Sequence, residues 1–280
     1  MDRQTLLAEI FRKKSFLCVG LDTEPGKLPE PLRNQPDAVF SFNRQIIDAT
    51  RDLCVAYKPN LAFYEARGAE GWRDFERTVA YIGREHFIIA DAKRGDIGNT
   101  SRLYASAFFE SLNCDAVTVA PYMGEDSVVP FLGFPGKWAI VLALTSNPGS
   151  ENFQRNGLED TRELVWEKVM RLSQCWGSPD NLMFVVGATH PEAFARARAI
   201  APGHFFLVPG VGAQGGDLAA VCRMGLTPDC GLLINASRSI LYAASGPGFA
   251  TAARAEAQRL QTEMAELLPQ YTNGHGGNQP

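Results

Sequence analysis

A regular alternation of two kinds of segment constrains the fold of this 280-residue chain more than any other feature. Short apolar runs typical of buried strands alternate with longer stretches whose apolar residues recur with helical periodicity. Such alternation requires parallel strands joined by crossover helices. The strand-like runs are residues 16–21, 54–57, 87–90, 116–120, 138–144, 182–186, 205–208 and 231–234.

The number of these units predicts an α/β protein with a (β/α)8 TIM barrel. Eight strand and helix units in about 250 residues is the usual size of that fold. A doubly wound open sheet is the competing architecture. The expected helices cover residues 39–52, 72–84, 101–112, 126–132, 161–176, 192–200, 218–224 and 249–268.

No composition break or long linker divides the chain, so we expect one catalytic domain over residues 1–270. Residues 271–280 are rich in glycine and polar side chains, and we expect a disordered tail there. Residues 1–14 predict a short amphipathic helix that covers the bottom of the barrel. Residues 24–37 hold four prolines and predict a long first loop on the face where barrel active sites lie. That loop either roofs the pocket or is a passive surface excursion.

The overall composition excludes several classes of function. With 45% hydrophobic residues, 21% charged residues and a net charge of −4, the chain is typical of a globular protein and not of a general nucleic-acid binder. No apolar run approaches the roughly 18 residues needed to span a membrane, and no signal-like run begins the chain. We therefore expect a cytoplasmic protein with no nucleic-acid or membrane partner.

The cysteines and histidines do not predict a metal site. The six cysteines include no C-x-x-C pair, and we interpret them as reduced thiols of the core. The four histidines are scattered, without the spacing of metal ligands. We therefore expect no metal site.

Three charged residues crowd the end of the third strand-like run. Asp91 and Lys93 are two residues apart, so in a strand their side chains point the same way, and Asp96 follows in the next loop. Two carboxylates in a poorly hydrated site would repel each other, and a lysine between them relieves that repulsion. Taken alone, this cluster is equally compatible with solvated loop residues.

Other strand ends also carry polar side chains. The first strand ends in Asp22, the second in Lys58 followed by Pro59 and Asn60, and the fifth in a stretch that contains Ser146. In a TIM barrel these ends converge on one pocket. We therefore expect these side chains to share a site with Asp91 and Lys93.

The last two units predict a phosphate site. The seventh strand leads into a glycine-rich turn over residues 208–217, and the eighth is followed by Ser237 and Arg238. Glycines let main-chain N–H groups approach an anion, and arginine donates several hydrogen bonds to phosphate. Residues 210–215 also match G-x-G-x-x-G, but the dinucleotide fingerprint belongs in the first βαβ unit. We assign the turn to phosphate, not to a nicotinamide cofactor.

Together these motifs resemble the orotidine 5'-phosphate decarboxylase family, in its longer bacterial form. They occur in the family's order and run from residue 19 to residue 240. The matching stretches are VGLD at 19–22, KPN at 58–60, DAKRGDIGNT at 91–100, TSNPG at 145–149, PGVGAQGGD at 209–217 and SRSI at 237–240.

The resemblance implies a homodimeric barrel that converts orotidine 5'-phosphate (OMP) into UMP and CO2 without a cofactor. It implies that Asp91 lies against the substrate carboxylate, that Lys93 protonates C6 of the ring, and that Lys58 completes an alternating array of charges. It further implies that Asp96 and two nearby residues reach the neighbouring subunit's site. Those two are Ile97 and Thr100.

The resemblance also assigns the remaining substrate contacts. Asp22, Lys58, Asp96 and Thr100 would surround the ribose hydroxyls, and Ser146 would contact the pyrimidine. Gln214, Arg238 and the main-chain N–H groups of Ser237 and Arg238 would hold the 5'-phosphate. The substrate-binding set implied in this way is Asp22, Ile97, Thr100, Ser146, Pro209, Val211, Gln214, Ser237 and Arg238.

Two alternatives stay open at this point. A related magnesium-dependent sugar-phosphate lyase or decarboxylase would share D-x-K-x-x-D but would want an acidic metal ligand near the end of the second strand, where this chain has Lys58. A non-catalytic barrel that senses a nucleotide would have no reason to keep Asp91, Lys93 and Asp96 together.

Overall fold

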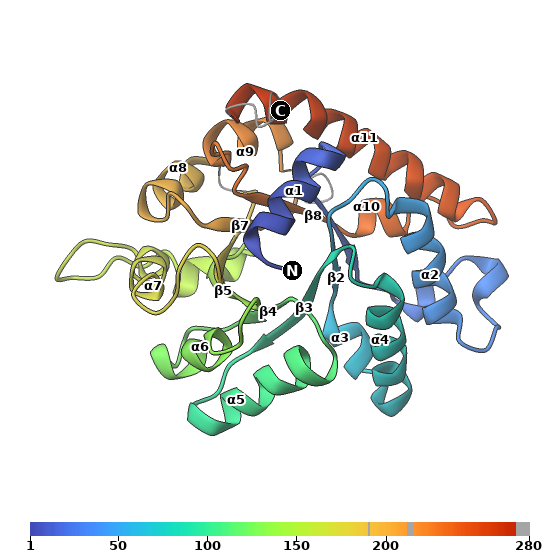
Figure 1. Ribbon diagram of the computed structural model, residues 1–280, viewed down its shortest axis with the longest axis horizontal. Coiled ribbons are helices and arrows are strands. Elements are labelled where there is room, and N and C mark those ends of the chain that lie inside the picture. The colour runs from blue at the N-terminus through green and yellow to red at the C-terminus, as the bar shows by residue number, and fades with distance from the viewer. Residues whose placement is uncertain (190, 212–215, 273–280) are drawn as a thin grey trace, which may run out of the picture.

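The computed structural model describes residues 1–189, 191–211 and 216–272. Its eight parallel strands form a closed barrel in sequence order, and β8 pairs with β1. The TIM barrel predicted from the alternation is therefore confirmed, and the doubly wound sheet is excluded (Figure 1). The strands are β1 Leu17–Leu21, β2 Ala56–Pro59, β3 Phe87–Arg94, β4 Ala116–Val119, β5 Trp138–Leu144, β6 Leu182–Val186, β7 Phe205–Pro209 and β8 Leu232–Ala236.

Helices surround the barrel on its outside, as the crossover connections require (Figure 1). The longest, α11, lies against α2. The helices are α1 Arg3–Lys13, α2 Ala38–Thr50, α3 Leu61–Glu65, α4 Gly68–Ile82, α5 Gly98–Ser106, α6 Glu125–Leu132, α7 Val165–Ser173, α8 Pro191–Ile200, α9 Leu218–Gly225, α10 Arg238–Leu241 and α11 Phe249–Tyr271. Shorter helical turns are η1 Pro25–Lys27, η2 Glu30–Leu32, η3 Ala107–Ser111 and η4 Pro148–Asn152, of which η3 is a π-helix.

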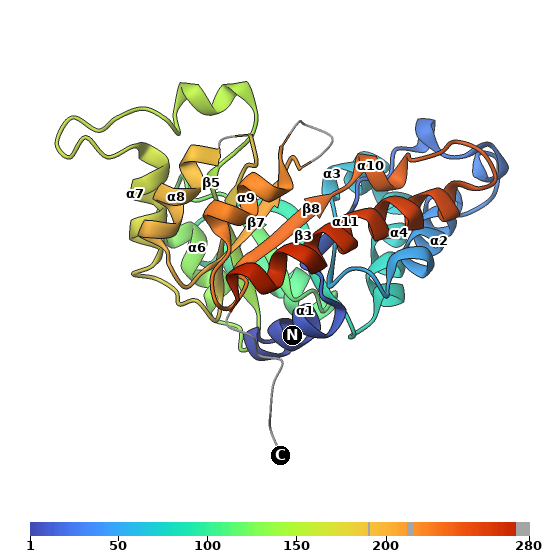
Figure 2. The same ribbon diagram turned by 90° about the horizontal axis from the view of Figure 1, so that it is seen from above.

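Helix α1 covers the amino-terminal end of the barrel, as predicted. The Asp2 side chain caps it by accepting a hydrogen bond from Thr5 N, and Leu6 and Ile10 are fully buried. The indole N–H of Trp138, at the start of β5, donates to the Met1 carbonyl at 3.0 Å. Figure 2 shows α1 at one end of the barrel and α3 and α10 at the other. The carboxyl ends of the strands thus lie at the end of the barrel opposite α1.

Several predicted boundaries differ from the observed ones. Strand β3 continues to Arg94 instead of ending at residue 90, because its last residues form a bulge that still pairs with β4. Helix α7 begins at Val165 and not at residue 161, because Leu164 pairs with Gly157 in a bridge. The short helices α3 and α10 were not predicted, since four or five residues are too few to show a periodicity.

The cysteine prediction is largely confirmed. All six cysteines are free, and five are buried, but Cys175 is exposed and does not belong to the core. No helix in the described ranges is both long and apolar enough to span a membrane. Helix α11 ends at Tyr271, and residues 273–280 lie outside the described ranges, so the disordered tail stays a prediction.

Candidate active site

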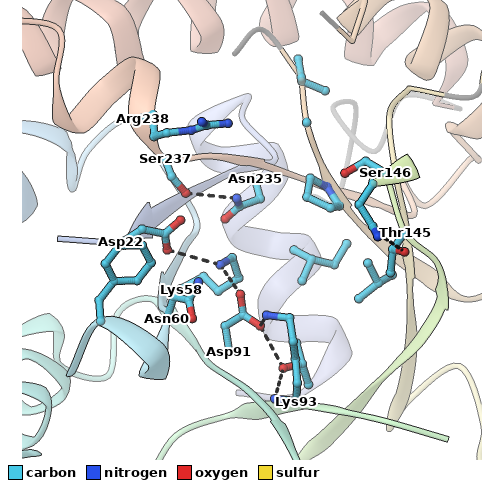
Figure 3. A pocket seen from close by; sticks show the side chains of 18 of the residues that line it. Asp22, Lys58, Asn60, Asp91, Lys93, Thr145, Ser146, Asn235, Ser237 and Arg238 are labelled. Carbon is cyan, nitrogen blue, oxygen red and sulfur yellow. Dashed lines mark hydrogen bonds and ion pairs between the residues drawn. The ribbon is translucent and has the colours of Figure 1, made fainter. Parts of the chain in front are cut away.

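A pocket of about 550 Å³ lies at the carboxyl ends of the strands. Its wall includes side chains from the ends of β1, β2, β3, β7 and β8, which confirms that the polar strand ends converge (Figure 3). The predicted site residues that line it are Asp22, Lys58, Asp91, Lys93, Ser146, Pro209, Val211, Ser237 and Arg238.

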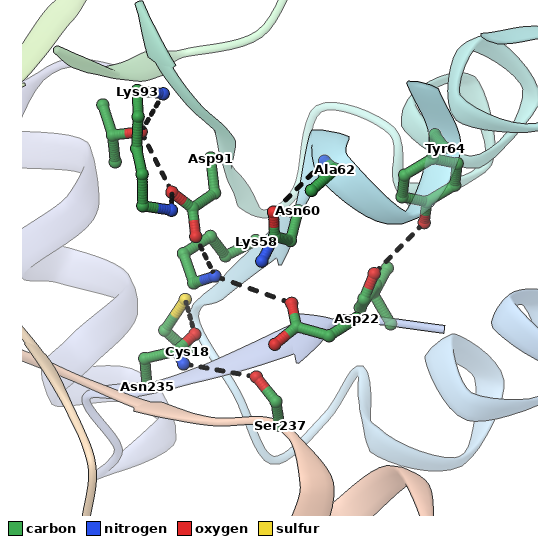
Figure 4. A network of polar contacts seen from close by, with 12 residues as sticks. Cys18, Asp22, Lys58, Asn60, Ala62, Tyr64, Asp91, Lys93, Asn235 and Ser237 are labelled. Atoms are coloured by element: carbon green, nitrogen blue, oxygen red, sulfur yellow. Dashed lines mark hydrogen bonds and ion pairs between the residues drawn. The ribbon is translucent and has the colours of Figure 1, made fainter. Parts of the chain in front are cut away.

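At the base of the pocket, Asp91 lies between two lysines. The Lys58 ammonium donates to Asp91 Oδ2 at 2.6 Å, and the Lys93 ammonium donates to Asp91 Oδ1 at 2.6 Å (Figure 4). Lys58 Nζ also lies 3.8 Å from Asp22 Oδ1. Lys58 and Asp91 are buried, whereas half of the Lys93 side chain is exposed. The four groups thus alternate in charge from Asp22 through Lys58 and Asp91 to Lys93.

This alternation keeps the buried groups ionised. Burial alone would lower the pKa of Lys58, but the carboxylates of Asp91 and Asp22 outweigh burial and raise that pKa above its usual value. Burial would likewise raise the pKa of Asp91, but the ammonium groups of Lys58 and Lys93 hold it well below its usual range. The site therefore presents the ionised Asp91 carboxylate and the charged Lys58 ammonium at neutral pH.

The ends of β7 and β8 form the opposite wall. Pro209, Val211, Ser237 and Arg238 line the pocket there, and Arg238 is the first residue of α10. Ser237 packs so closely over β1 that a Cβ on Gly20 would lie 1.8 Å from its hydroxyl oxygen, so only glycine fits at that position. Gln214 lies outside the described residues, and its predicted phosphate contact stays a prediction.

Three predicted site residues do not line the pocket of their own chain. Asp96 lies between β3 and α5, and its side chain accepts a hydrogen bond from Ile97 N at 2.8 Å. The Ile97 side chain is 56% exposed, and Thr100 is exposed on the first turn of α5. These residues are the ones that the resemblance assigns to a neighbouring subunit's site.

Sequence reasoning missed several residues of the pocket wall. Glu24 and Lys27 belong to the start of the proline-rich loop, so that loop contributes to the pocket and is not merely a surface excursion. Tyr242 fixes it by accepting a hydrogen bond from Glu24 N at 2.9 Å and donating to the Asp22 carbonyl at 3.1 Å. No sequence pattern pointed to Tyr242.

Thr118, on β4, also lines the pocket and was missed. It is the one polar side chain in a strand of alanine and valine, which was a usable signal. The remaining unpredicted wall is mainly apolar and comes from β5, β6 and β7 through Leu142, Val185 and Leu207. The pocket thus joins a charged floor to an apolar side.

Within the described ranges, no group of three or more His, Cys, Asp or Glu side chains is arranged to hold a metal ion. At the end of β2, where a magnesium-dependent relative would want an acidic ligand, Lys58 pairs with Asp91. The pocket thus has two lysines and a carboxylate at its base, and Arg238 in the wall formed by the ends of β7 and β8.

Known proteins are similar in sequence to this chain over almost its whole length. The model of the orotidine 5'-phosphate decarboxylase / HUMPS family matches residues 15–254. A protein of Phocaeicola vulgatus named orotidine 5'-phosphate decarboxylase is 57% identical over 274 residues, which cover 96% of this chain and 100% of that one. One of Bacteroides fragilis with the same name is 57% identical over 272 residues, covering 96% and 98%.

Solved structures agree with the sequence comparison. The OMP decarboxylase of Leishmania donovani has a TM-score of 0.82 and 38% identity, covering 95% of this chain and 99% of that one. The UMP synthase of the same organism matches with a TM-score of 0.82 and 40% identity over 94% of this chain, which spans only 55% of the synthase. The predicted resemblance is therefore confirmed, and the chain belongs to the orotidine 5'-phosphate decarboxylase / HUMPS family.

Proposed function

We propose that this chain is a carboxy-lyase of pyrimidine biosynthesis that converts OMP into UMP and CO2. The observation that carries the proposal is the Lys58–Asp91–Lys93 array at the mouth of the barrel. Relatives that are 57% identical over nearly the whole chain carry the name of this activity. The proposal puts the orotate ring over the polar floor of the pocket and the phosphate on the Arg238 side, and residues of both regions line the same pocket.

The chemistry explains why a lysine lies beside a carboxylate. When the bond between C6 and the carboxylate breaks, CO2 leaves and its electron pair stays on C6. The ring has no electron sink of the kind that PLP or TPP provides, so the barrier without a catalyst is very high. The Lys93 ammonium stabilises the charge that develops at C6 and then transfers its proton there, which forms the C–H bond of UMP. No cofactor enters this sequence.

Asp91 and Lys58 prepare Lys93 for that role. The Asp91 carboxylate accepts from Lys93 and lies against the substrate carboxylate, whereas Lys58 stabilises Asp91 in its ionised form. Asp22, Lys58, Asp96 and Thr100 bind the ribose hydroxyls, and Ser146 binds the pyrimidine. Gln214, Arg238 and the main-chain N–H groups of Ser237 and Arg238 hold the 5'-phosphate. Pro209 and Val211 complete the set of residues that bind the substrate. Binding energy from the remote phosphate helps to orient and desolvate the ring.

We also propose that the enzyme is a homodimer in which Asp96, Ile97 and Thr100 complete the partner's site. Exposed apolar residues lie near this stretch, on α5, on α6, which packs against α5, and in the loop between β4 and α6. A patch of exposed apolar residues on a globular protein usually marks an interaction surface. The exposed fractions of these residues are 56% for Ile97, 62% for Leu103, 93% for Tyr122, 47% for Met123 and 38% for Val129.

The test is the turnover of OMP by purified protein in the presence of a metal chelator. Conversion is followed by the loss of orotate absorbance and by the appearance of UMP. We expect full activity with the chelator present. Failure to convert OMP, or a requirement for a divalent ion, would contradict the proposal and would favour a nucleotide sensor or a magnesium-dependent enzyme respectively.

A further inference from the structure

Strand β3 departs from regular pairing at the point where it carries Asp91 and Lys93. Ala90 pairs with Val117 of β4, and the next pair is Arg94 with Val119. Residues 91–93 therefore lie opposite a single residue of β4, which is Thr118. The backbone of Lys93 is in the left-handed region, with a φ of 48°, which is unfavourable for residues other than glycine. Bulges of this kind turn side chains in new directions and are frequent next to active sites.

The hydroxyl of Thr118 connects the two catalytic residues across this bulge. Its oxygen accepts a hydrogen bond from the main-chain N–H of Lys93 at 2.9 Å and donates one to Asp91 Oδ1 at 3.0 Å. Thr118 is only 1% exposed, so water does not compete for these bonds. Figure 4 shows Lys93 and Asp91 joined both through the lysine side chain and through the backbone side of the bulge.

Lys93 needs such a constraint because its side chain is long and half exposed. Its ammonium is held through Asp91, and Asp91 is itself oriented by Lys58 and Thr118. Without the hydroxyl, the N–H of Lys93 would lose its acceptor and the strained bulge would lose the bond that spans it. The position of the Lys93 backbone and the orientation of the Asp91 carboxylate, which directs the ammonium, would then both vary more.

We propose that Thr118 is a positioning residue that sets the geometry of proton transfer from Lys93. One hydroxyl fixes the backbone from which the lysine extends and the carboxylate that orients its ammonium. The inference rests on the proposed function, because it assumes that Lys93 is the proton donor. Small displacements of a reacting group cost large factors in rate, so the loss of this hydroxyl acts mainly on kcat.

The experiment compares Thr118→Val, which removes the hydroxyl at nearly constant volume, with Thr118→Ser, which retains it. We expect Thr118→Val to lower kcat for OMP by about tenfold to a hundredfold. The dissociation constant for UMP should change by less than about threefold, because the phosphate is held elsewhere. Thr118→Ser should restore kcat to within about threefold of the wild-type value.

Thr50→Val is the matched control, since Thr50 is a buried threonine of α2 whose hydroxyl bonds to the Ile46 carbonyl and to Tyr57, away from the pocket. It should lower the thermal midpoint without changing kcat. An unchanged kcat in Thr118→Val would overturn the inference, and so would a loss of UMP affinity as large as the loss of kcat. An equal loss of kcat in Thr50→Val would do the same, because destabilisation alone would then explain the effect.

A second measurement separates this inference from the proposed function. Exchange of the Lys93 amide hydrogen with D2O should be at least about tenfold faster in Thr118→Val than in Thr118→Ser or wild type. If the wild-type protein does not convert OMP, the proposed function fails, and the exchange rates still decide whether Thr118 holds the bulge. Equal exchange in Thr118→Val and wild type would overturn the positioning role whatever the turnover.

Discussion

At the carboxyl end of the barrel the buried cation Lys58 lies among carboxylates, whereas at the amino end Arg198 lies among main-chain carbonyls. Arg198 donates hydrogen bonds to the carbonyls of Gly225, Ala201, His204 and Gly231, and its guanidinium lies 3.9 Å from the centroid of the Phe206 ring. Burial lowers the pKa of Arg198 to about 9. The carboxylates around Lys58, in contrast, raise the pKa of Lys58.

The comparison indicates that this fold places the groups that act on a ligand at one end of the barrel and groups that stabilise the fold at the other. Carbonyls satisfy the hydrogen bonds of Arg198, but they do not neutralise its charge, and they tie together the loops at the start of β7 and β8. At the other end, opposite charges stabilise one another and face an open pocket. Substitutions at the carboxyl end should therefore act first on turnover, and substitutions at the amino end first on stability.

The largest effect is expected from Lys93→Ala. Loss of a general acid costs about 10²–10⁴-fold in rate, and the charge that the ammonium stabilises would also be unpaired in the transition state. We expect turnover of OMP to fall below detection while UMP still binds, because the proposed phosphate site lies on the Arg238 side of the pocket, away from Lys93. Steady-state kinetics and calorimetric titration with UMP measure the two quantities.

A lysine at the amino end supplies the control for this variant. Lys137 donates to the Cys114 carbonyl at 2.7 Å, and Lys137→Ala should lower stability without changing kcat. If Lys93→Ala lost UMP binding as strongly as turnover, Lys93 would be a binding residue and not the proton donor.

The next prediction concerns Asp96, which follows Lys93 in the chain but does not line the same pocket. Homodimers of Lys93→Ala and of Asp96→Asn should both be inactive. When their subunits exchange, each hybrid has one site with both wild-type residues, so roughly one quarter of all sites should recover activity. Turnover measured before and after mixing tests this, with native mass spectrometry to verify the exchange. No recovery after verified exchange would mean that Asp96 acts within its own chain.

Much of the carboxyl end could be predicted from the sequence. The alternation of strands and helices fixes which residues lie at strand ends, and the barrel brings those ends together. The sequence therefore predicts that Asp22, Lys58, Asp91 and Lys93 are neighbours, and the distances between their side chains agree. The resemblance added the functional roles, which spacing alone does not supply.

The remaining features depend on contacts between distant segments. The bulge in β3 extends the strand past residue 90 because Thr118 accepts from Lys93, and hydrophobic periodicity does not reveal such a bond. Tyr242 reaches the loop before α2 across more than 200 positions of sequence. At the amino end, no sequence pattern pointed to Arg198, because its carbonyl acceptors come from several separate loops.

A moderate effect is expected from Arg198→Met. The substitution keeps an apolar side chain over Phe206 but leaves several carbonyls without a donor, at about 1–3 kcal/mol for each buried group that water does not reach. We expect the free energy of unfolding to fall by about 2–4 kcal/mol with kcat unchanged. Denaturant unfolding at a fixed protein concentration measures the change.

Arg254→Met provides the comparison, because the pair of Arg254 with Asp52 is exposed on both sides and should contribute less than about 1 kcal/mol. A large loss of kcat in Arg198→Met would break the proposed separation between the two ends. Lys58→Met should show the opposite pattern, with turnover lost because Asp91 is left without one of its two cations.

The smallest effect is expected from a change of pH. The pH range in which stability is lost differs between the two ends of the barrel. Burial, together with Arg198 and Arg3, lowers the pKa of His204 at the amino end to about 4. Its usual value is 6.5, so between pH 6.5 and 4 the unfolded chain binds a proton that the native state does not, and stability falls as the pH falls. Asp91, whose pKa is depressed, loses its contribution only below about pH 4, where the unfolded carboxylate takes up its proton.

The free energy of unfolding falls between pH 7 and pH 4. In His204→Phe this decrease should be smaller than in wild type by on the order of 2 kcal/mol. Both ring nitrogens of His204 lack a hydrogen-bond partner within the described residues, so the apolar ring loses little at neutral pH. His86 is the second group in this window, because burial and Lys13 lower its pKa to about 4, and it should account for part of the slope that remains. Unfolding curves at several pH values measure the slopes, and an identical slope in wild type and His204→Phe would show that His204 does not contribute to acid stability in this range.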